Sequence, residues 1–95
     1  MSGLAFEWDR RKDAANRRKH GVGFAEASTV FGDPLAITIS DPEHAVDEER
    51  FVNIGMSSKR SLLIVVHTMR EDRIRLLSAR PATRNERRKY EETFS

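Results

Sequence analysis

The side chains best suited to chemistry in this sequence are histidines and arginines. His20 and His67 carry imidazoles, which exchange a proton near neutral pH, and Arg75 and Arg80 carry guanidinium groups, which hold an anion through paired hydrogen bonds. These groups suit metal-free cleavage of a phosphodiester, which needs a base for the attacking hydroxyl, cations for the charge on phosphorus and an acid for the departing oxygen. We take His20, His67, Arg75 and Arg80 as the candidate catalytic set.

Other basic residues are candidates for binding the phosphates of a polyanion. Lys12 and Lys19 are seven residues apart, which places them on nearly the same face of a helix. Arg73 shares a strand face with Arg75, and Arg50 follows two glutamates that offer it a local ion pair. We expect Lys12, Lys19, Arg50 and Arg73 to contact such phosphates.

Each candidate also has a structural explanation, and the residue pattern leaves both open. His20 ends a predicted helix, where a protonated imidazole is favourable, and His67 shares a strand face with Leu63 and Val65, as a core histidine would. Arg75 and the other arginines are equally able to pair with acids on neighbouring elements, and the lysines can be ordinary solvated side chains.

Composition excludes several classes of site. The chain has no cysteine, so disulfides, zinc-thiolate sites and thiol nucleophiles are excluded. The acidic stretch holding Asp41, Glu43, His44 and Asp47 lacks an established metal-ligand framework, and phosphate-binding glycine loops and nucleophile elbows are missing. We therefore expect no metal and no cofactor. The longest apolar run, residues 62–66, is far too short to span a membrane, so we expect a cytoplasmic protein that does not bind membranes.

Charge is distributed unevenly along the chain. Residues 1–20 carry a net +3, residues 21–69 a net −4 and residues 70–95 a net +3, which together give the formal net charge of +2. If the two basic ends meet in space, they form one positive surface suited to a polyanion, with the acidic middle facing elsewhere. Two ordinary solvated helices would explain the same composition.

Two helices are predicted near the N-terminus. Asp9 is a favourable N-cap for a helix through about His20, and Gly21 supplies the left-handed residue that commonly ends a helix. Apolar residues at three- and four-residue spacing over 24–31 predict a second short helix, which Gly32-Asp33-Pro34 stops.

Strands and a last helix follow. Alternating or continuous apolar patterns predict strands over residues 35–40, 50–56, 61–68 and 73–80. Thr83 and Glu86 have the spacing of a capping box, and the helix that they open presents Tyr90 and Phe94 one turn apart, which favours a core-facing pair over a catalytic tyrosine. The predicted order is ααββββα, an α+β domain with a four-stranded, mainly antiparallel sheet.

Landmarks in both halves of the sequence resemble those of the BrnT toxins. The N-terminal half carries Phe6-Glu7-Trp8-Asp9, Lys12, Asn16, Lys19-His20-Gly21-Val22, Phe24, Ala27, Val30-Phe31, Asp33-Pro34, Glu49-Arg50 and Gly55. The C-terminal half carries Leu63, Val65, His67-Thr68, Arg73-Ile74-Arg75, Ser78-Ala79-Arg80, Ala82, Glu86 and Tyr90. The resemblance covers roughly residues 6–90, and residues 1–95 are expected to form a single BrnT-like toxin domain.

The resemblance implies a RelE-like fold and a ribonuclease that arrests translation in the bacterial cytoplasm. The polyanion is then RNA, and the expected roles are RNA cleavage for His20, His67, Arg75 and Arg80 and RNA binding for Lys12, Lys19, Arg50 and Arg73. The resemblance further implies neutralisation by a BrnA-like antitoxin, with DNA reached only indirectly through that partner. A non-catalytic module that uses the same cations to hold RNA or an acidic partner is the alternative. Direct reading of DNA is disfavoured because the sequence has no helix-turn-helix or basic-zipper pattern.

Overall fold

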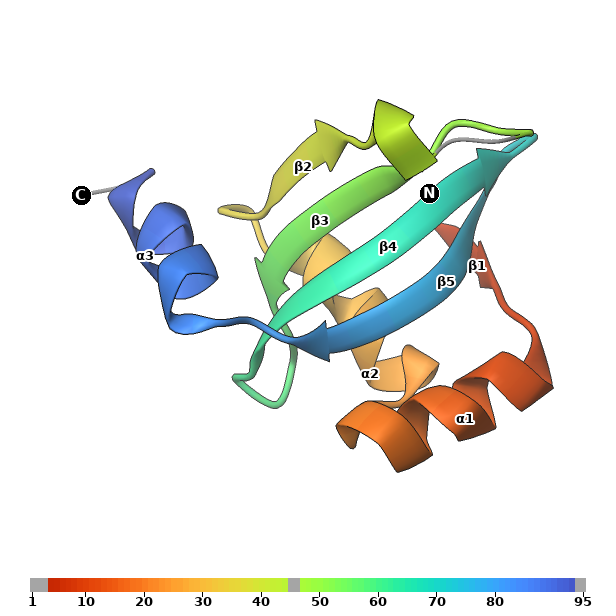
Figure 1. The fold of residues 1–95 in the computed structure, drawn as a ribbon, viewed down its shortest axis with the longest axis horizontal. Helices are drawn as coiled ribbons and strands as arrows, with labels where there is room; N and C mark the ends of the chain where they lie inside the picture. The colour runs from red at the N-terminus through yellow and green to blue at the C-terminus, as the bar shows by residue number, and fades with distance from the viewer. Residues whose placement is uncertain (1–3, 45–46, 94–95) are drawn as a thin grey trace.

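The computed structural model describes residues 4–44 and 47–93. Its strands form one small sheet, and the helices lie around that sheet (Figure 1). The strands are β1 Ala5–Glu7, β2 Ile37–Ser40, β3 Phe51–Met56, β4 Leu62–Arg70 and β5 Arg73–Pro81. The helices are α1 Arg10–His20, α2 Phe24–Ser28 and α3 Arg84–Glu92, with short 3₁₀ helices at η1 Thr29–Gly32 and η2 Pro42–His44.

The sheet corrects the predicted layout by one strand. Within the described residues it has five strands in the order β1-β5-β4-β3-β2, and β1 runs parallel to β5 while all other pairs are antiparallel. The predicted four-stranded ααββββα arrangement missed β1. Three residues are too short to show a strand period, and Ala5–Glu7 pairs with Arg73–Arg75, far along the chain.

The helix ends agree closely with their predicted capping residues. The Asp9 carboxylate accepts hydrogen bonds from the backbone N–H groups of Arg11 and Lys12, and Gly21 ends α1 with φ of 73°. Thr83 and Glu86 form the predicted capping box of α3. The second predicted helix is α-helical only to Ser28 and continues as η1. Phe94, expected to pair with Tyr90, lies outside the described residues.

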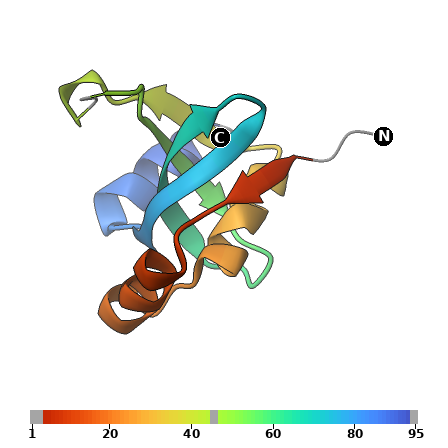
Figure 2. The same ribbon diagram turned by 90° about the vertical axis from the view of Figure 1, so that its right-hand side faces the viewer.

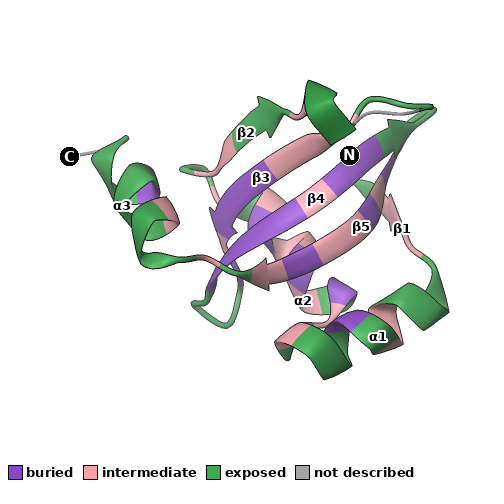
Figure 3. Ribbon diagram, in the orientation of Figure 1, coloured by how far each residue is buried: buried purple, intermediate pink, exposed green. Residues whose placement is uncertain are grey.

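The two faces of the sheet are covered differently. Helices α2 and η1 pack one face around a core that includes Phe24, Val30, Leu63 and Val65, and α2 passes behind the sheet in Figure 1. Among the described residues, α3 packs on the opposite face through a smaller cluster around Tyr90. Figure 2 shows the same sheet edge-on between these layers, and Figure 3 shows β4 buried along most of its length with an exposed end, while α1 is mostly exposed. The sheet face beside α3 therefore stays partly open.

Helix α1 is attached to the sheet by a buried asparagine. The Asn16 side chain accepts a hydrogen bond from the Ala79 N–H at 3.1 Å and donates to the Ala79 carbonyl at 2.7 Å, as a neighbouring strand would. It also donates to the Val22 carbonyl at 2.8 Å. Because β1 pairs only with the start of β5, the asparagine satisfies backbone groups that no strand reaches.

A bulge in β5 decides which side chains reach the open face. Val66 pairs with Ser78 and His67 with Leu76, so Leu77 has no partner in the ladder. Arg75 and Arg80 would lie on opposite faces of a regular strand, because side chains alternate. The extra residue reverses the alternation, and both arginines share the open face.

Loss of the Asn16 amide should destabilise the fold through unpaired buried backbone groups. We expect Asn16→Ala to lower the free energy of unfolding by about 3 kcal/mol, measured by urea denaturation, because each buried group left unsatisfied costs about 1–3 kcal/mol. Asn85→Ala is the matched control, since Asn85 is exposed on α3. Equal stability of the two variants would contradict this role of Asn16.

Candidate RNA-binding groove

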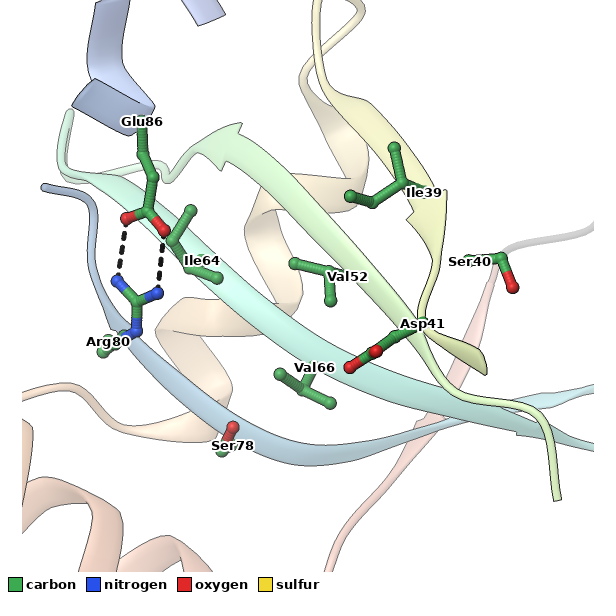
Figure 4. Close-up of a pocket in the computed structure, with 9 residues that line it drawn as sticks. All are labelled: Ile39, Ser40, Asp41, Val52, Ile64, Val66, Ser78, Arg80 and Glu86. Atoms are coloured by element: carbon green, nitrogen blue, oxygen red, sulfur yellow. Dashed lines mark hydrogen bonds and ion pairs between the residues drawn. The ribbon is translucent and has the colours of Figure 1, made fainter. Parts of the chain in front are cut away.

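The open face of the sheet carries a groove made of adjoining hollows, which we call the open-face groove. The first hollow, of about 380 Å³, lies over β3, β4 and β5 (Figure 4). A middle hollow shares Asp41, Val66 and Ser78 with it, and the last hollow shares Lys12, Arg50 and Leu77 with the middle one. These shared residues make the hollows one continuous surface from α3 to the far end of β5.

The first hollow combines an apolar floor with a charged wall. Val52, Ile64 and Val66 form its floor, while Arg80 and Glu86 project over it from β5 and α3 (Figure 4). Such a floor suits the flat face of a ribose or base, and the wall offers hydrogen bonds to a charged group.

Arg80 is fixed in the first hollow by a two-bond ion pair. Its two terminal nitrogens each donate to one oxygen of the Glu86 carboxylate at 2.8 Å. The Arg80 guanidinium is the main cause that lowers the pKa of Glu86 to about 2. The same carboxylate accepts the Thr83 N–H at 2.8 Å, so Glu86 serves both the arginine and the start of α3. The pair orients the guanidinium before any ligand arrives.

Arg75 lies in the last hollow and is held from β1. Its guanidinium donates to the Glu7 carboxylate at 2.9 Å, and the two residues are directly opposed in the parallel β1–β5 register. Arg73 approaches the same carboxylate at 3.9 Å, but its side chain is 60% exposed and lies outside the residues that line the groove. Arg75 therefore lines the groove, whereas Arg73, on the same strand face, does not.

Lys12 and Arg50 are the cations of the groove without a carboxylate partner in the part of the chain that the structure describes. Lys12 comes from the first turn of α1, one turn before Asn16, and Arg50 precedes β3. Both line the middle and the last hollows. Their charges are therefore available to an anionic ligand without breaking an ion pair.

The acidic loop between β2 and β3 does not face away from the basic ends, as the charge distribution suggested. Asp47 and Glu48 line the last hollow, where Glu48 pairs with Arg70 at 3.2 Å. The groove is thus bordered by both signs of charge, and its positive character is concentrated around Lys12 and Arg50.

Sequence reasoning did not assign a proton-transfer role to Asp41 or His44. Their side chains meet at the middle of the groove, where His44 Nδ1 lies 3.0 Å from Asp41 Oδ2. The sequence suggests these residues only as part of an acidic stretch with oxygen ligands, and among the described residues no group of three or more metal-binding side chains exists. The pattern that would have found them is an aspartate and a histidine at i and i+3 directly after a strand.

His20 and Lys19, two of the predicted site residues, lie on other surfaces of the molecule. His20 lines a separate hollow with Arg60 and Arg87, at the C-terminal end of α1. Lys19 is exposed seven residues beyond Lys12, about 10 Å along the helix axis, and is not among the residues that line the groove.

His67 lies in the core on the helix-covered face. Its ring packs edge-on against Phe31 at 4.9 Å and stacks on Phe51 at 5.6 Å between ring centres. Burial lowers the pKa of His67, so the imidazole is held neutral. Its Nδ1 has no hydrogen-bond partner among the described residues. This placement favours packing over proton transfer in the groove.

Tyr90 attaches α3 to the sheet. Its hydroxyl donates to the Asp33 carboxylate at 2.6 Å, and the same carboxylate accepts the Met56 and Leu35 N–H groups. Burial, together with the hydrogen bond to Asp33, raises the pKa of Tyr90 to about 12. The tyrosine therefore positions the helix that carries Glu86.

The fold and groove define a class: a small α+β domain with α2 and η1 on one sheet face and, on the other, a partly open groove beside α3 that is lined by basic and acidic side chains. The family model "Ribonuclease toxin, BrnT, of type II toxin-antitoxin system" matches residues 8–86. The chain belongs to this family of ribonuclease toxins, and membership implies an antitoxin partner.

Comparison with solved structures agrees on the fold. The chain is similar to the crystal structure of the Brucella abortus ribonuclease toxin BrnT, with a TM-score of 0.66 and 20% sequence identity over 86% of this chain and 100% of that one. No curated protein matches the sequence. Within the described residues, no helix is both long and apolar enough to cross a membrane.

The Arg80–Glu86 pair should make stability depend on pH in an acid window. Because the pKa of Glu86 is lowered from 4.5 to about 2 in the folded state, its contribution is present above about pH 4.5 and is lost as the pH falls toward 2. We expect Glu86→Gln to be less stable than the wild type near neutral pH, with the difference in unfolding free energy shrinking in acid, measured by urea denaturation across this range.

Glutamine keeps the capping box, so this experiment isolates the charge. Glu91→Gln, an exposed change in the same helix, is the matched control. A difference that stays constant from neutral pH to the acid limit would argue against the ion pair as its source.

Proposed function

We propose that the open-face groove binds RNA and cleaves it without a metal ion. One observation carries the proposal: Lys12, Arg50, Arg75 and Arg80, from separate parts of the chain, line one continuous groove. Membership of a ribonuclease toxin family supports RNA as the polyanion. An extended single strand suits an open groove, because cations can follow its phosphates while bases rest on apolar side chains.

The proposed role of each groove cation depends on whether a carboxylate already holds it. Lys12 and Arg50 hold phosphates, since neither is engaged by a carboxylate among the described residues. Arg75 and Arg80 stabilise the charge that develops on phosphorus, because Glu7 and Glu86 already orient their guanidinium groups. A guanidinium has five N–H donors, so these pairs leave donors for an anion.

The reaction class follows from the groups present. The ribose 2′-oxygen attacks the neighbouring phosphorus, the bond to the 5′-oxygen breaks, and the products carry a 2′,3′-cyclic phosphate and a 5′-hydroxyl. His20, His67, Lys19 and Arg73 stand outside the groove and are assigned no contact with the reacting atoms in this proposal. Cleavage of RNAs needed for protein synthesis would arrest translation.

We further propose a BrnA-like antitoxin as the partner that neutralises the toxin, with DNA contacted only through it. Lys12 and Arg50, which have no carboxylate partner among the described residues, suit an acidic segment of such a partner. The alternative function is a non-catalytic module that holds RNA or its antitoxin, and the ion pairs of Arg75 and Arg80 are the observation that favours it.

Removing a groove cation should lower RNA cleavage without unfolding the protein. We expect Lys12→Ala and Arg50→Ala to reduce kcat/KM on a defined RNA about 10- to 100-fold, because a charge-assisted contact is worth about 1.5–3 kcal/mol. Arg75→Ala and Arg80→Ala should lower kcat, with only partial rescue by lysine, which lacks the planar fork. All reactions contain excess EDTA, and thermal unfolding is measured in parallel.

Arg18→Ala, which removes the same charge from the exposed side of α1, should leave cleavage unchanged. Intact RNA with the wild-type protein, with and without ribosomes, would favour the binding module. Full activity of all the groove variants would place the reaction elsewhere on the molecule.

The antitoxin should cover the open-face groove. In hydrogen exchange of the toxin–antitoxin complex we expect new protection over residues 10–16, 47–52 and 75–80. The reason is that acidic side chains of the partner fit the groove cations, and apolar side chains fit the groove floor. Residues 57–61, in the turn between β3 and β4, serve as the internal reference. Protection confined to that turn would contradict the predicted interface.

A further inference from the structure

The proposed reaction requires a proton acceptor inside the groove, and His44 is the histidine that lines it. His44 borders the middle hollow together with Lys12 and Arg50, whereas His20 lines a separate hollow and His67 is buried among aromatic rings. We infer that His44 is the catalytic base of RNA cleavage and that Asp41 is the residue that positions its ring. This inference rests on the function proposed above.

The hairpin between β2 and β3 brings the two side chains together. The Asp41 N–H donates to the Arg50 carbonyl at 2.8 Å, which closes the hairpin directly after β2. Residues 42–44 then form a single 3₁₀ turn that begins with a proline, whose restricted φ suits such a turn. Since residues i and i+3 overlie each other in a 3₁₀ turn, the imidazole is returned to the aspartate that precedes it.

The hydrogen bond within the pair leaves the outer ring nitrogen free to accept a proton. His44 Nδ1 lies 3.0 and 3.1 Å from the two oxygens of Asp41. A carboxylate accepts hydrogen bonds, so Nδ1 carries the hydrogen and the lone pair of the neutral ring lies on Nε2. The Asp41 side chain is 25% exposed and that of His44 is 68% exposed, so the carboxylate is the sheltered member and the ring is accessible to a ligand.

The charges around the pair favour a phosphate beside it. The titratable and charged groups that line the middle hollow are Asp41 and His44 from the hairpin, Lys12 from α1 and Arg50 just before β3. Ser78 and Leu77 of β5 complete that side of the hollow. A phosphodiester held by the two unpaired cations therefore has its ribose on the surface that the imidazole shares.

The proton and bond changes of the step balance without a further reactant. Nε2 of His44 takes the proton of the ribose 2′-hydroxyl while the 2′-oxygen forms its bond to phosphorus. The bond from phosphorus to the 5′-oxygen breaks, and that oxygen receives a proton from solvent. The imidazolium then returns its proton to solvent, and Asp41 stabilises the charged ring in the interval.

Single-turnover cleavage of one defined RNA in EDTA tests the inference with the full-length toxin. General-base removal typically lowers a rate 10²- to 10⁴-fold, so we expect His44→Ala to cleave at least about 100-fold more slowly. Binding of the same RNA with a 2′-deoxy residue at the cleaved position should change less than about threefold, since base removal leaves the phosphate contacts intact. Added imidazole should restore part of the His44→Ala rate.

Asp41→Asn separates positioning from packing. Asparagine can still accept the Nδ1 hydrogen through its amide oxygen, but it lacks the negative charge that stabilises the imidazolium, so we expect a loss of rate with unchanged thermal unfolding. The wild-type rate should rise with pH through the range in which imidazole loses its proton, and His44→Ala should lose this dependence. Glu43→Gln, a charge change in the same turn and outside the groove lining, should keep both the rate and the pH profile.

The outcomes distinguish this inference from the function that it rests on. Wild-type cleavage together with loss of rate, retained RNA binding and imidazole rescue in His44→Ala supports it. Wild-type cleavage with equal rates and pH profiles in His44→Ala overturns it and leaves the proposed ribonuclease function standing. RNA that stays intact with the wild type, with and without ribosomes, overturns the proposed function itself and the role of His44 with it.

Discussion

The attachment of α1 to β5 through Asn16 is the contact on which the groove depends. The asparagine takes the place of a neighbouring strand at Ala79, where β1 no longer reaches, and it also ties down the chain after the helix at Val22. Lys12 lies one turn earlier on the same helix and so borders the open face rather than solvent alone. A polar side chain in a buried position thereby joins a basic helix to an apolar sheet.

The open face is shaped by irregularities rather than by regular strands. The bulge at Leu77 brings Arg75 and Arg80 onto one face, and Glu7 and Glu86 then fix their guanidinium groups at two ends of the surface. Oriented guanidinium groups lose less conformational freedom on binding an anion than mobile ones do. In the proposed function, the paired arginines orient the anion, whereas Lys12 and Arg50, which have no carboxylate partner among the described residues, attract it.

Patterns that depend on neighbours in the chain were predictable, and those that depend on distant partners were not. The caps at Asp9, Gly21 and Thr83 placed the ends of α1 and the start of α3, and apolar periodicity placed the four longer strands. β1 was missed because its partner is remote, and Asn16 because an amide in a helix gives no apolar period. The groove cations Lys12 and Arg50 were identified as RNA-binding candidates, but His44 was hidden in a stretch that composition describes only as acidic.

The two attachments of Glu86 link occupancy of the groove to the order of the last helix. This carboxylate accepts hydrogen bonds from Arg80 and from the Thr83 N–H that begins α3. A ligand that draws the guanidinium toward itself changes the forces on the same carboxylate, and a ligand that grips α3 changes the orientation of the guanidinium. By thermodynamic reciprocity, the coupling free energy is the same in both directions. The order of α3 and the occupancy of the open-face groove are thus coupled to each other. The coupling runs through Glu86, the residue of α3 that lines the first hollow.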